Sequence, residues 1–208
     1  MNALRRAERR AAPKPARIPL GDRSMYPSIE GLPSAWVERW SHLVAAGARV
    51  LDVACGSGRH VRWFAGRGAL VTALDRDAAA LEPLRGVADD IIVADIEHGP
   101  WPLAGRRFAA VLCTNYLWRP VLPAIVDAVD AGGVLLNETF AVGNASVGRP
   151  SNPDFLLRPG ELLAAAHGLR VVAYEDGFID LPARFVQRIA AVREGAPPDA
   201  AAPPRYAL

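Results

Sequence analysis

Five short apolar runs, separated by stretches with helical spacing, constrain the fold of this chain most strongly. The runs lie at 48–55, 69–75, 90–95, 107–115 and 133–141. Strands that are apolar throughout are typical of a parallel sheet covered by helices on both faces. Right-handed crossovers between such strands make the sheet doubly wound.

The intervening stretches predict helices, and the last third of the chain predicts a hairpin. Ser34 is a suitable N-cap and Gly47 a suitable stop for a helix within 32–47. Further helices are expected at 58–68, 76–87, 118–133 and 158–168. Two strand-like runs, 169–178 and 184–192, follow with only a short loop between them, so they must pair antiparallel. The prediction is an α/β fold with a mostly parallel, seven-stranded sheet that ends in an antiparallel hairpin.

The length of 208 residues suits one well-buried domain. Residues 1–20 contain six basic side chains and one acid, and their Ala, Arg and Pro content predicts a disordered arm. Residues 195–208 read as a Pro/Ala-rich tail beyond the fold. We therefore expect a single domain at 21–194, with an N-terminal lid and helix at 21–47.

Charge and composition limit the classes of binding partner that we expect. The net charge of the whole chain is +2, and residues 1–20 alone carry +5, so the remaining residues carry −3. This mildly acidic remainder argues against a nucleic-acid-binding core. No apolar run approaches the roughly 18 residues that span a bilayer, and the start shows no signal-peptide pattern. Cys55 and Cys113 match no disulfide framework or zinc spacing. We expect a cytoplasmic protein without a membrane or nucleic-acid partner.

The segment VLDVACGSGRH, residues 50–60, predicts a nucleotide-type ligand site. Gly56 and Gly58 follow the first strand and leave the backbone bare for close approach of a ligand. Three acids, Asp52, Asp75 and Asp95, end three successive strands. We expect Asp75 to bridge two ribose hydroxyls and Asp95 to accept a hydrogen bond from an adenine amino group, with Ile96 packing on the ring. Each acid alone could instead cap a helix or a turn, but together they indicate an adenosine pocket.

Two sequence features distinguish between adenosine ligands. Nicotinamide dinucleotides usually require G-x-G-x-x-G, whereas Val61 stands at the third glycine position. The expected terminal hairpin also differs from a generic dinucleotide-binding fold. Both features weaken a dinucleotide reading without excluding it.

The residues from 34 to 192 resemble the class I S-adenosylmethionine-dependent methyltransferases. The segments that carry the resemblance are VLDVACGSGRH, VTALD, VADIE, VLCTNYL and AGGVLLNETF. Within that superfamily the chain is most similar to small bacterial enzymes of the tellurite-resistance type. Ala54 stands where the family usually has the first glycine of the loop, a mild change that should preserve the turn.

This resemblance implies in-line transfer of a methyl group from S-adenosylmethionine to a small-molecule acceptor. It implies that the residues ending the fourth strand lie beside the methionine part of the donor. The expected cofactor-binding residues are Arg23, Asp52, Ala54, Gly56, Gly58, Asp75, Arg76, Asp95, Ile96, Cys113, Thr114 and Asn115. Because the donor is already activated, the protein mainly has to position and desolvate the reactants, so a catalytic dyad is not required.

The acceptor side is expected at the loop 137–155, which is long, polar and contains glycines. The candidates there are Glu138, Phe140 and Asn144, together with Tyr116 after the fourth strand. Residues 21–28 could fold over the donor, with Arg23 meeting its carboxylate and Tyr26 stacking over the pocket. We assign no general base to the four scattered histidines.

Several classes are disfavoured, and two other readings stay open. Three signatures of other methylase classes are missing: the Asn/Asp-Pro-Pro-aromatic run of exocyclic-amine methylases, the acidic magnesium set of catechol-type enzymes, and the paired-glutamate loop of arginine methylases. Because the acidic set is missing, no metal is expected. A non-catalytic S-adenosylmethionine-binding protein is the first alternative, and an NAD-linked oxidoreductase is the second. The sequence does not indicate the acceptor or the oligomeric state.

Overall fold

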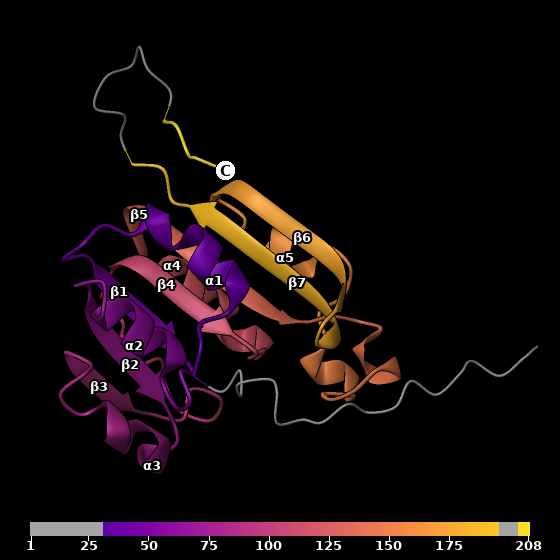
Figure 1. Cartoon of the computed structure of the whole chain (residues 1–208), viewed down its shortest axis with the longest axis horizontal. Helices are drawn as coiled ribbons and strands as arrows, with labels where there is room; N and C mark the ends of the chain where they lie inside the picture. Colours follow the sequence, from indigo (N-terminus) through magenta and orange to yellow (C-terminus); the bar gives the residue numbers. More distant parts are fainter. Residues whose placement is uncertain (1–30, 196–203) are drawn as a thin grey trace, which may run out of the picture.

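A seven-stranded sheet organises the computed structural model, which describes residues 31–195 and 204–208. The strands are β1 (Arg49–Val53), β2 (Leu70–Asp75), β3 (Asp90–Val93), β4 (Phe108–Thr114), β5 (Val129–Phe140), β6 (Arg170–Asp180) and β7 (Ala183–Val192). Their order is β3-β2-β1-β4-β5-β7-β6, so β3 and β6 form the two edges (Figure 1). The first five strands pair in parallel, and β7 lies antiparallel between β5 and β6. The predicted mostly parallel sheet with a terminal hairpin is confirmed.

Helices cover both faces of this sheet. They are α1 (Ala35–Trp40), α2 (Arg59–Ala65), α3 (Ala78–Leu81), α4 (Leu122–Asp127) and α5 (Glu161–Ala165). Short 3-10 helices lie at Ser41–Leu43, Glu82–Leu84, Arg119–Val121, Asn144–Ser146 and Pro153–Phe155. None of the helices in the described part of the chain is long and apolar enough to cross a membrane.

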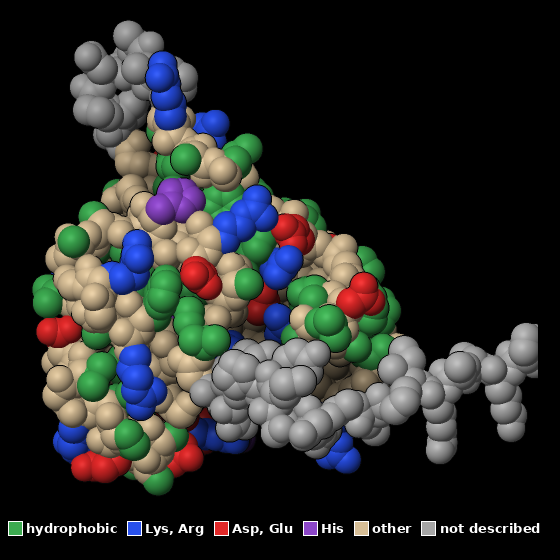
Figure 2. Space-filling view, in the orientation of Figure 1, with side chains coloured by type: hydrophobic (Ala, Val, Ile, Leu, Met, Phe, Trp, Pro, Cys, Tyr) green, Lys and Arg blue, Asp and Glu red, His purple; other side chains and the backbone are tan. Residues whose placement is uncertain are grey.

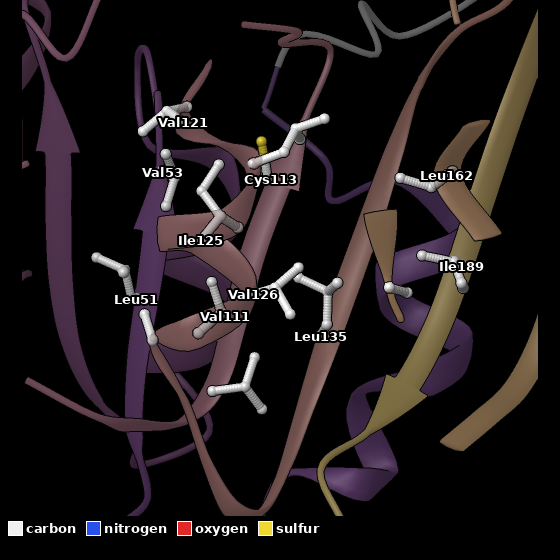
Figure 3. Close-up of a cluster of buried hydrophobic side chains, with 14 of the residues drawn as sticks. Leu51, Val53, Val111, Cys113, Val121, Ile125, Val126, Leu135, Leu162 and Ile189 are labelled. Atoms are coloured by element: carbon white, nitrogen blue, oxygen red, sulfur yellow. The ribbon is translucent and has the colours of Figure 1, made fainter. Parts of the chain in front are cut away.

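Because successive strand side chains point to opposite faces, the apolar strands bury one cluster on each side. Val50 and Leu112 belong to the cluster under α1, α2 and α3. Leu51 and Val111 belong to the cluster under α4 and α5, which Figure 3 shows from close by. The doubly wound arrangement therefore follows from strands without a polar face.

The first helix is shorter than the predicted 32–47. Ser34 caps α1 as expected, since its hydroxyl accepts a hydrogen bond from the Val37 amide at 3.2 Å. The helix ends at Trp40 and continues only as the 3-10 turn Ser41–Leu43, where the Ser41 hydroxyl donates to the Glu38 carbonyl. Val44 is already extended, so the chain leaves the helix before Gly47.

The predicted helix 118–133 is wrong in its second half. The α-helix ends at Asp127, and β5 begins at Val129 rather than at Gly133. Phe108 pairs with Val129 whereas Ala110 pairs with Val134, so residues 130–133 bulge from the ladder. Gly132 adopts a φ of +78°, which a bulge of this kind accommodates readily at glycine. The apolar pattern of residues 129–133 does not distinguish a helix from a buried strand, because a buried strand has no polar face.

The ends of the chain bear on the expected domain limits. Residues 1–30, which include the predicted arm and most of the lid, lie outside the described residues, as do residues 196–203. At the C-terminus the Arg170 guanidinium lies 5.6 Å from the centre of the Tyr206 ring, and His42 contacts the Ala207 carbonyl at 3.3 Å. Tyr206 and Ala207 therefore contact the domain, while Leu208 is exposed. The domain limits themselves stay a prediction.

Charged side chains of both signs are interspersed on the face shown in Figure 2, among the residues drawn in colour. On this face the described residues form no continuous basic track of the kind that follows a nucleic-acid backbone.

Candidate active site

The loop between β1 and α2 turns through three left-handed residues. Ala54, Gly56 and Gly58 have φ values of +52°, +54° and +77°. A Cβ atom at Gly58 would lie 2.4 Å from the Leu84 side chain, so glycine is required there by both space and conformation. The turn is preserved at Ala54 as the sequence predicts, although an L-residue is strained in this region.

The carboxylate of Asp75 holds this loop at the end of β2. Its Oδ2 accepts a hydrogen bond from the Gly56 amide at 2.8 Å, and its Oδ1 accepts one from the Asp77 amide at 2.9 Å. Each carboxylate oxygen can accept a second hydrogen bond. Asp75 is therefore fixed in orientation while it retains the capacity to bind two hydroxyl groups.

A pocket opens beside Asp75 at the carboxyl ends of β1, β2 and β3. We call it the first pocket, and its lining residues are Ala54, Leu74, Asp75, Arg76, Ala94, Asp95, Ile96, Glu97 and Tyr116. Five of the twelve predicted cofactor residues (Ala54, Asp75, Arg76, Asp95 and Ile96) meet here, together with the acceptor-side candidate Tyr116. Carboxyl edges of open α/β sheets are the usual place for ligands.

Asp95 lies in the first pocket but is already engaged. Its Oδ1 accepts hydrogen bonds from the amides of Glu97 and His98, and its Oδ2 contacts His98 Nδ1 at 2.9 Å. The hydrogen bond with the His98 side chain is the main cause that lowers the pKa of Asp95 below its usual range. The carboxylate thus shapes the turn after β3, and its contact with an adenine amino group stays a prediction.

Glu97 was missed by the sequence reasoning. It lines the first pocket, and its carboxylate lies 3.7 Å from Arg76 Nη1. Its position two residues after Asp95, at the same strand end, was the available signal.

Asp52 lies beneath the loop rather than in the first pocket. Its side chain is 1% exposed, and burial raises its pKa to about 8. Among the described residues no group donates a hydrogen bond to its Oδ2, and His60 Nδ1 is 3.9 Å away. Asp52 is therefore buried next to the donor loop, in surroundings that favour its uncharged form.

His60, which we did not assign as a general base, makes a structural contact. Its Nε2 accepts a hydrogen bond from the Ser34 amide at 3.1 Å, and burial lowers its pKa to about 3. The neutral ring thus joins α2 to the start of α1.

A second pocket adjoins the first and shares Glu97 and Tyr116 with it. Its lining residues are Glu97, Asn115, Tyr116, Leu117, Thr139, Phe140, Pro150 and Phe155. Burial is the main cause that raises the pKa of the Tyr116 phenol, and the Glu97 charge adds to it. Among the acceptor-side candidates, Phe140 and Tyr116 line this pocket, while Pro150 and Phe155 were not predicted.

The remaining candidates lie elsewhere. Cys113 is buried in the cluster under α4, where burial raises its pKa to about 12. The Asn144 amide donates to the Pro150 carbonyl and accepts from the Phe185 amide, so it fastens its loop to β7. Thr114 accepts from Arg59 at 3.4 Å, and Glu138 is buried against Arg184 and Arg188. Arg23 and Tyr26 lie outside the described residues.

The residues of the first pocket fit an adenosine group. Asp75 offers two carboxylate oxygens, Gly56 leaves the backbone bare, and Ile96 and Leu74 supply apolar surface. Within residues 31–195 and 204–208, no three His, Cys, Asp or Glu side chains are grouped as metal ligands.

Comparisons with known proteins agree with this geometry. The protein family described as a methyltransferase domain matches residues 50–133. A malonyl-[acyl-carrier protein] O-methyltransferase of Salmonella typhimurium is 35% identical over 104 residues, which are 47% of this chain and 41% of that protein. The matched region is thus less than half of the relative's length.

Two solved structures share the fold at low identity. TehB from Haemophilus influenzae superposes with a TM-score of 0.62 at 18% identity, over 78% of this chain and 63% of that chain. A TehB-like S-adenosylmethionine-dependent methyltransferase from Corynebacterium glutamicum gives 0.57 at 17% identity, over 76% and 87%. The tellurite-resistance resemblance within the superfamily rests on fold alone. Residues 50–133 thus match a methyltransferase-domain family, and the fold is shared with solved structures that include an S-adenosylmethionine-dependent methyltransferase.

Proposed function

We propose that this protein transfers the methyl group of S-adenosylmethionine to a small-molecule acceptor. The observation that carries the proposal is the first pocket, with Asp75 oriented by the Gly56 amide, on a sheet that ends in the β6–β7 hairpin. The family match over residues 50–133, which include the donor loop, supports it.

The described residues suit the binding of the donor. In this proposal the Asp75 carboxylate accepts the two ribose hydroxyls, Ile96 packs on the adenine, and Gly56 and Gly58 allow close approach to the loop. The other proposed donor contacts are Arg23, Asp52, Ala54, Arg76, Asp95, Cys113, Thr114 and Asn115. The donor supplies a methyl group that is activated on a sulfonium centre.

The acceptor is proposed to enter at the carboxyl ends of β4 and β5. Tyr116 lines both pockets, so an acceptor in the second pocket would lie beside the donor. Phe140 and Phe155 give this pocket an apolar lining, and alignment with the activated methyl group would supply much of the rate enhancement. No general base is assigned. A cytoplasmic location stays a prediction.

Two alternatives make different predictions. A non-catalytic binding protein would bind the donor but transfer no methyl group to any acceptor. An NAD-linked oxidoreductase would bind a nicotinamide dinucleotide. This hypothesis loses support because the sheet ends in a hairpin.

Calorimetric titration with S-adenosylhomocysteine, and separately with NAD, tests the proposal. We expect S-adenosylhomocysteine alone to bind, and Asp75→Ala to weaken it about 10-fold to 100-fold, because hydrogen bonds to a charged group contribute about 1.5–3 kcal/mol. Asp90→Ala is the matched control, since Asp90 is a partly buried acid on the neighbouring strand that pairs with Arg106 and does not line the first pocket. Binding of NAD without S-adenosylhomocysteine would refute the proposal. Labelled donor and a panel of acceptors then separate an enzyme from a binding protein.

A further inference from the structure

A charged row crosses the sheet at its carboxyl edge, on the face that α1 covers. Thr114 of β4 pairs with Glu138 of β5, and Glu138 pairs with Arg188 of β7. One step back on the same face, Leu112, Leu136 and Ala190 are apolar and buried. The face thus changes from apolar to charged between two rungs of the ladder, next to the donor loop.

The centre of this row is a buried carboxylate with incomplete hydrogen bonding. The Glu138 side chain is 1% exposed, and its oxygens lie 3.6 Å from Arg184 Nη2 and 3.4 Å from Arg188 Nη1. Within the described residues, Glu138 Oε1 and Arg184 Nε are buried without a hydrogen-bond partner. Arg188 makes its shorter bond elsewhere, from Nε to Glu175 at 2.7 Å.

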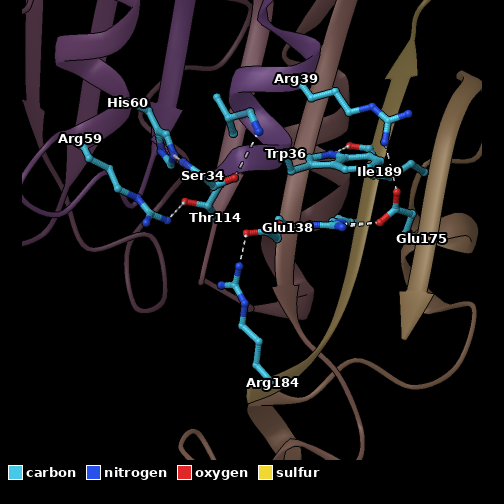
Figure 4. A network of polar contacts seen from close by, with 12 residues as sticks. Ser34, Trp36, Arg39, Arg59, His60, Thr114, Glu138, Glu175, Arg184 and Ile189 are labelled. Atoms are coloured by element: carbon cyan, nitrogen blue, oxygen red, sulfur yellow. Dashed lines mark hydrogen bonds and ion pairs between the residues drawn. The ribbon is translucent and has the colours of Figure 1, made fainter. Parts of the chain in front are cut away.

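A third guanidinium group approaches the same place. Arg59, in the first turn of α2, donates to the Thr114 hydroxyl at 3.4 Å. No carboxylate of the described residues lies within 4.0 Å of it. Figure 4 shows Arg59 reaching Thr114 from one side and Arg184 reaching Glu138 from another.

The charges in this cluster do not balance. Arg188 shares Glu175 with the more exposed Arg39, so Glu175 has no charge to spare, and Arg59 and Arg184 face the single charge of Glu138. Asp52, the other nearby acid, has a pKa raised to about 8 and is mainly uncharged at neutral pH. Burial lowers the pKa of Arg59, and the charge of Arg184 lowers it further, against the effect of Glu138 and Asp52. A partly buried excess of one positive charge is costly unless an anion joins it.

We propose that Arg59 and Arg184 bind a carboxylate group of the methyl acceptor, so that the acceptor is an anionic small molecule. The proposal rests on the proposed methyl transfer. Guanidinium groups present paired N–H donors that match the two oxygens of a carboxylate. One carboxylate would neutralise the excess charge and give Arg184 Nε an acceptor. Thr114 precedes Asn115 and Tyr116, which line the second pocket, so the cluster and the proposed acceptor entrance share one edge of the sheet.

The competing explanation is that the two arginines bind the carboxylate of the donor itself. The two explanations differ in competition. An acceptor carboxylate binds together with S-adenosylhomocysteine, whereas a site for the donor carboxylate is blocked by it.

Benzoate and its neutral isostere benzamide are the probes. Each is titrated by calorimetry at constant ionic strength, into the protein alone and into protein saturated with S-adenosylhomocysteine. The variants are Arg59→Gln and Arg184→Gln. The matched control is Arg170→Gln, because Arg170 lies on the hairpin but pairs with Glu194 at 2.8 Å instead of joining the cluster. Arg184→Lys retains the charge, and thermal unfolding shows whether each variant is folded.

We expect benzoate to bind the saturated protein at least ten times more tightly than benzamide does. Arg59→Gln and Arg184→Gln should each weaken benzoate at least ten-fold, Arg184→Lys less, and Arg170→Gln not at all. S-adenosylhomocysteine affinity should change less than two-fold in all four variants.

Equal binding of the two probes, or unchanged benzoate binding in folded Arg59→Gln and Arg184→Gln, would overturn the proposal. Competition between benzoate and S-adenosylhomocysteine, with weakened S-adenosylhomocysteine binding in Arg184→Gln, would assign the arginines to the donor instead. If the protein binds benzoate but no S-adenosylhomocysteine, the methyltransferase proposal fails, and with it the role of this anion site in holding an acceptor.

Discussion

At the scale of single residues, Ala54 stores strain at the turn of the donor loop. Its φ of +52° costs an L-residue about 1–2 kcal/mol, whereas glycine adopts this region freely. Glycine also gains freedom in the unfolded chain, which offsets part of the benefit.

Ala54→Gly is therefore expected to raise the free energy of unfolding by about 0.5–1 kcal/mol. Urea denaturation measures the change. Ala79→Gly is the control, because Ala79 is exposed in the α3 helix and its substitution should lower stability by up to about 1 kcal/mol. A destabilised Ala54→Gly variant would show that the loop does not adopt this turn.

Asp52 gives the protein a distinct pH dependence. The pKa of its carboxyl is raised from 3.8 to about 8 by burial, so the folded state holds the proton more tightly than the unfolded state. Between these two values the free energy of unfolding falls as pH rises, because the unfolded chain binds fewer protons.

Asp52→Asn cannot ionise and should remove this dependence. Relative to the wild type, the variant should gain more than about 1 kcal/mol of stability between about pH 5 and about pH 8. His60, whose pKa is lowered to about 3, contributes the opposite slope at lower pH, but it is present in both proteins and largely cancels. Denaturation at several pH values measures the difference. A difference that stays constant with pH would contradict the buried assignment.

At the scale of elements, the start of α1 depends on Ser34. The hydroxyl of this residue caps the Val37 amide, and its own amide donates to His60. Ser34→Ala removes only the cap, so it should lower the free energy of unfolding by about 1 kcal/mol. Ser151→Ala, at an exposed loop position, should leave stability within about 0.5 kcal/mol of the wild type. Thermal and urea unfolding of both variants give the comparison, and equal effects would argue against the cap.

The N-cap of α1 was predicted correctly and the start of β5 was not. Ser34 was identified from its own side chain, since N-caps are local. The start of β5 was missed because Val129 pairs with Phe108, which lies 21 residues earlier. Nothing local to residues 129–133 distinguishes a bulged strand from the last turn of a helix.

At the scale of the whole molecule, Glu138 connects three strands and α1. It pairs with Thr114 and Arg188 across the sheet, and Arg188 lies 5.0 Å from the Trp36 ring centre. Loss of its buried charge would leave Arg59 and Arg184 without their shared counter-charge, whereas Arg188 would retain Glu175.

Glu138→Gln should therefore lower the free energy of unfolding by about 2–4 kcal/mol, and added salt should restore part of this loss by screening the arginines. Glu194→Gln is the control, because this acid pairs with Arg170 at the surface and should change stability by less than about 1 kcal/mol. Denaturation at low and high salt measures both. A Glu138→Gln variant as stable as the Glu194→Gln variant would remove Glu138 from this structural role.

The sequence alone determined three features: apolar runs without a polar face, a bare glycine loop, and acids at successive strand ends. These features are local or periodic, so they follow from the chain itself. Only the tertiary structure separated Asp75, which faces the first pocket, from Asp52, which is buried under the loop. It alone also brought Arg59, Glu138 and Arg184 together from α2, β5 and β7. Contacts between distant residues depend on the register of the strands, and that register is decided by packing across the whole sheet.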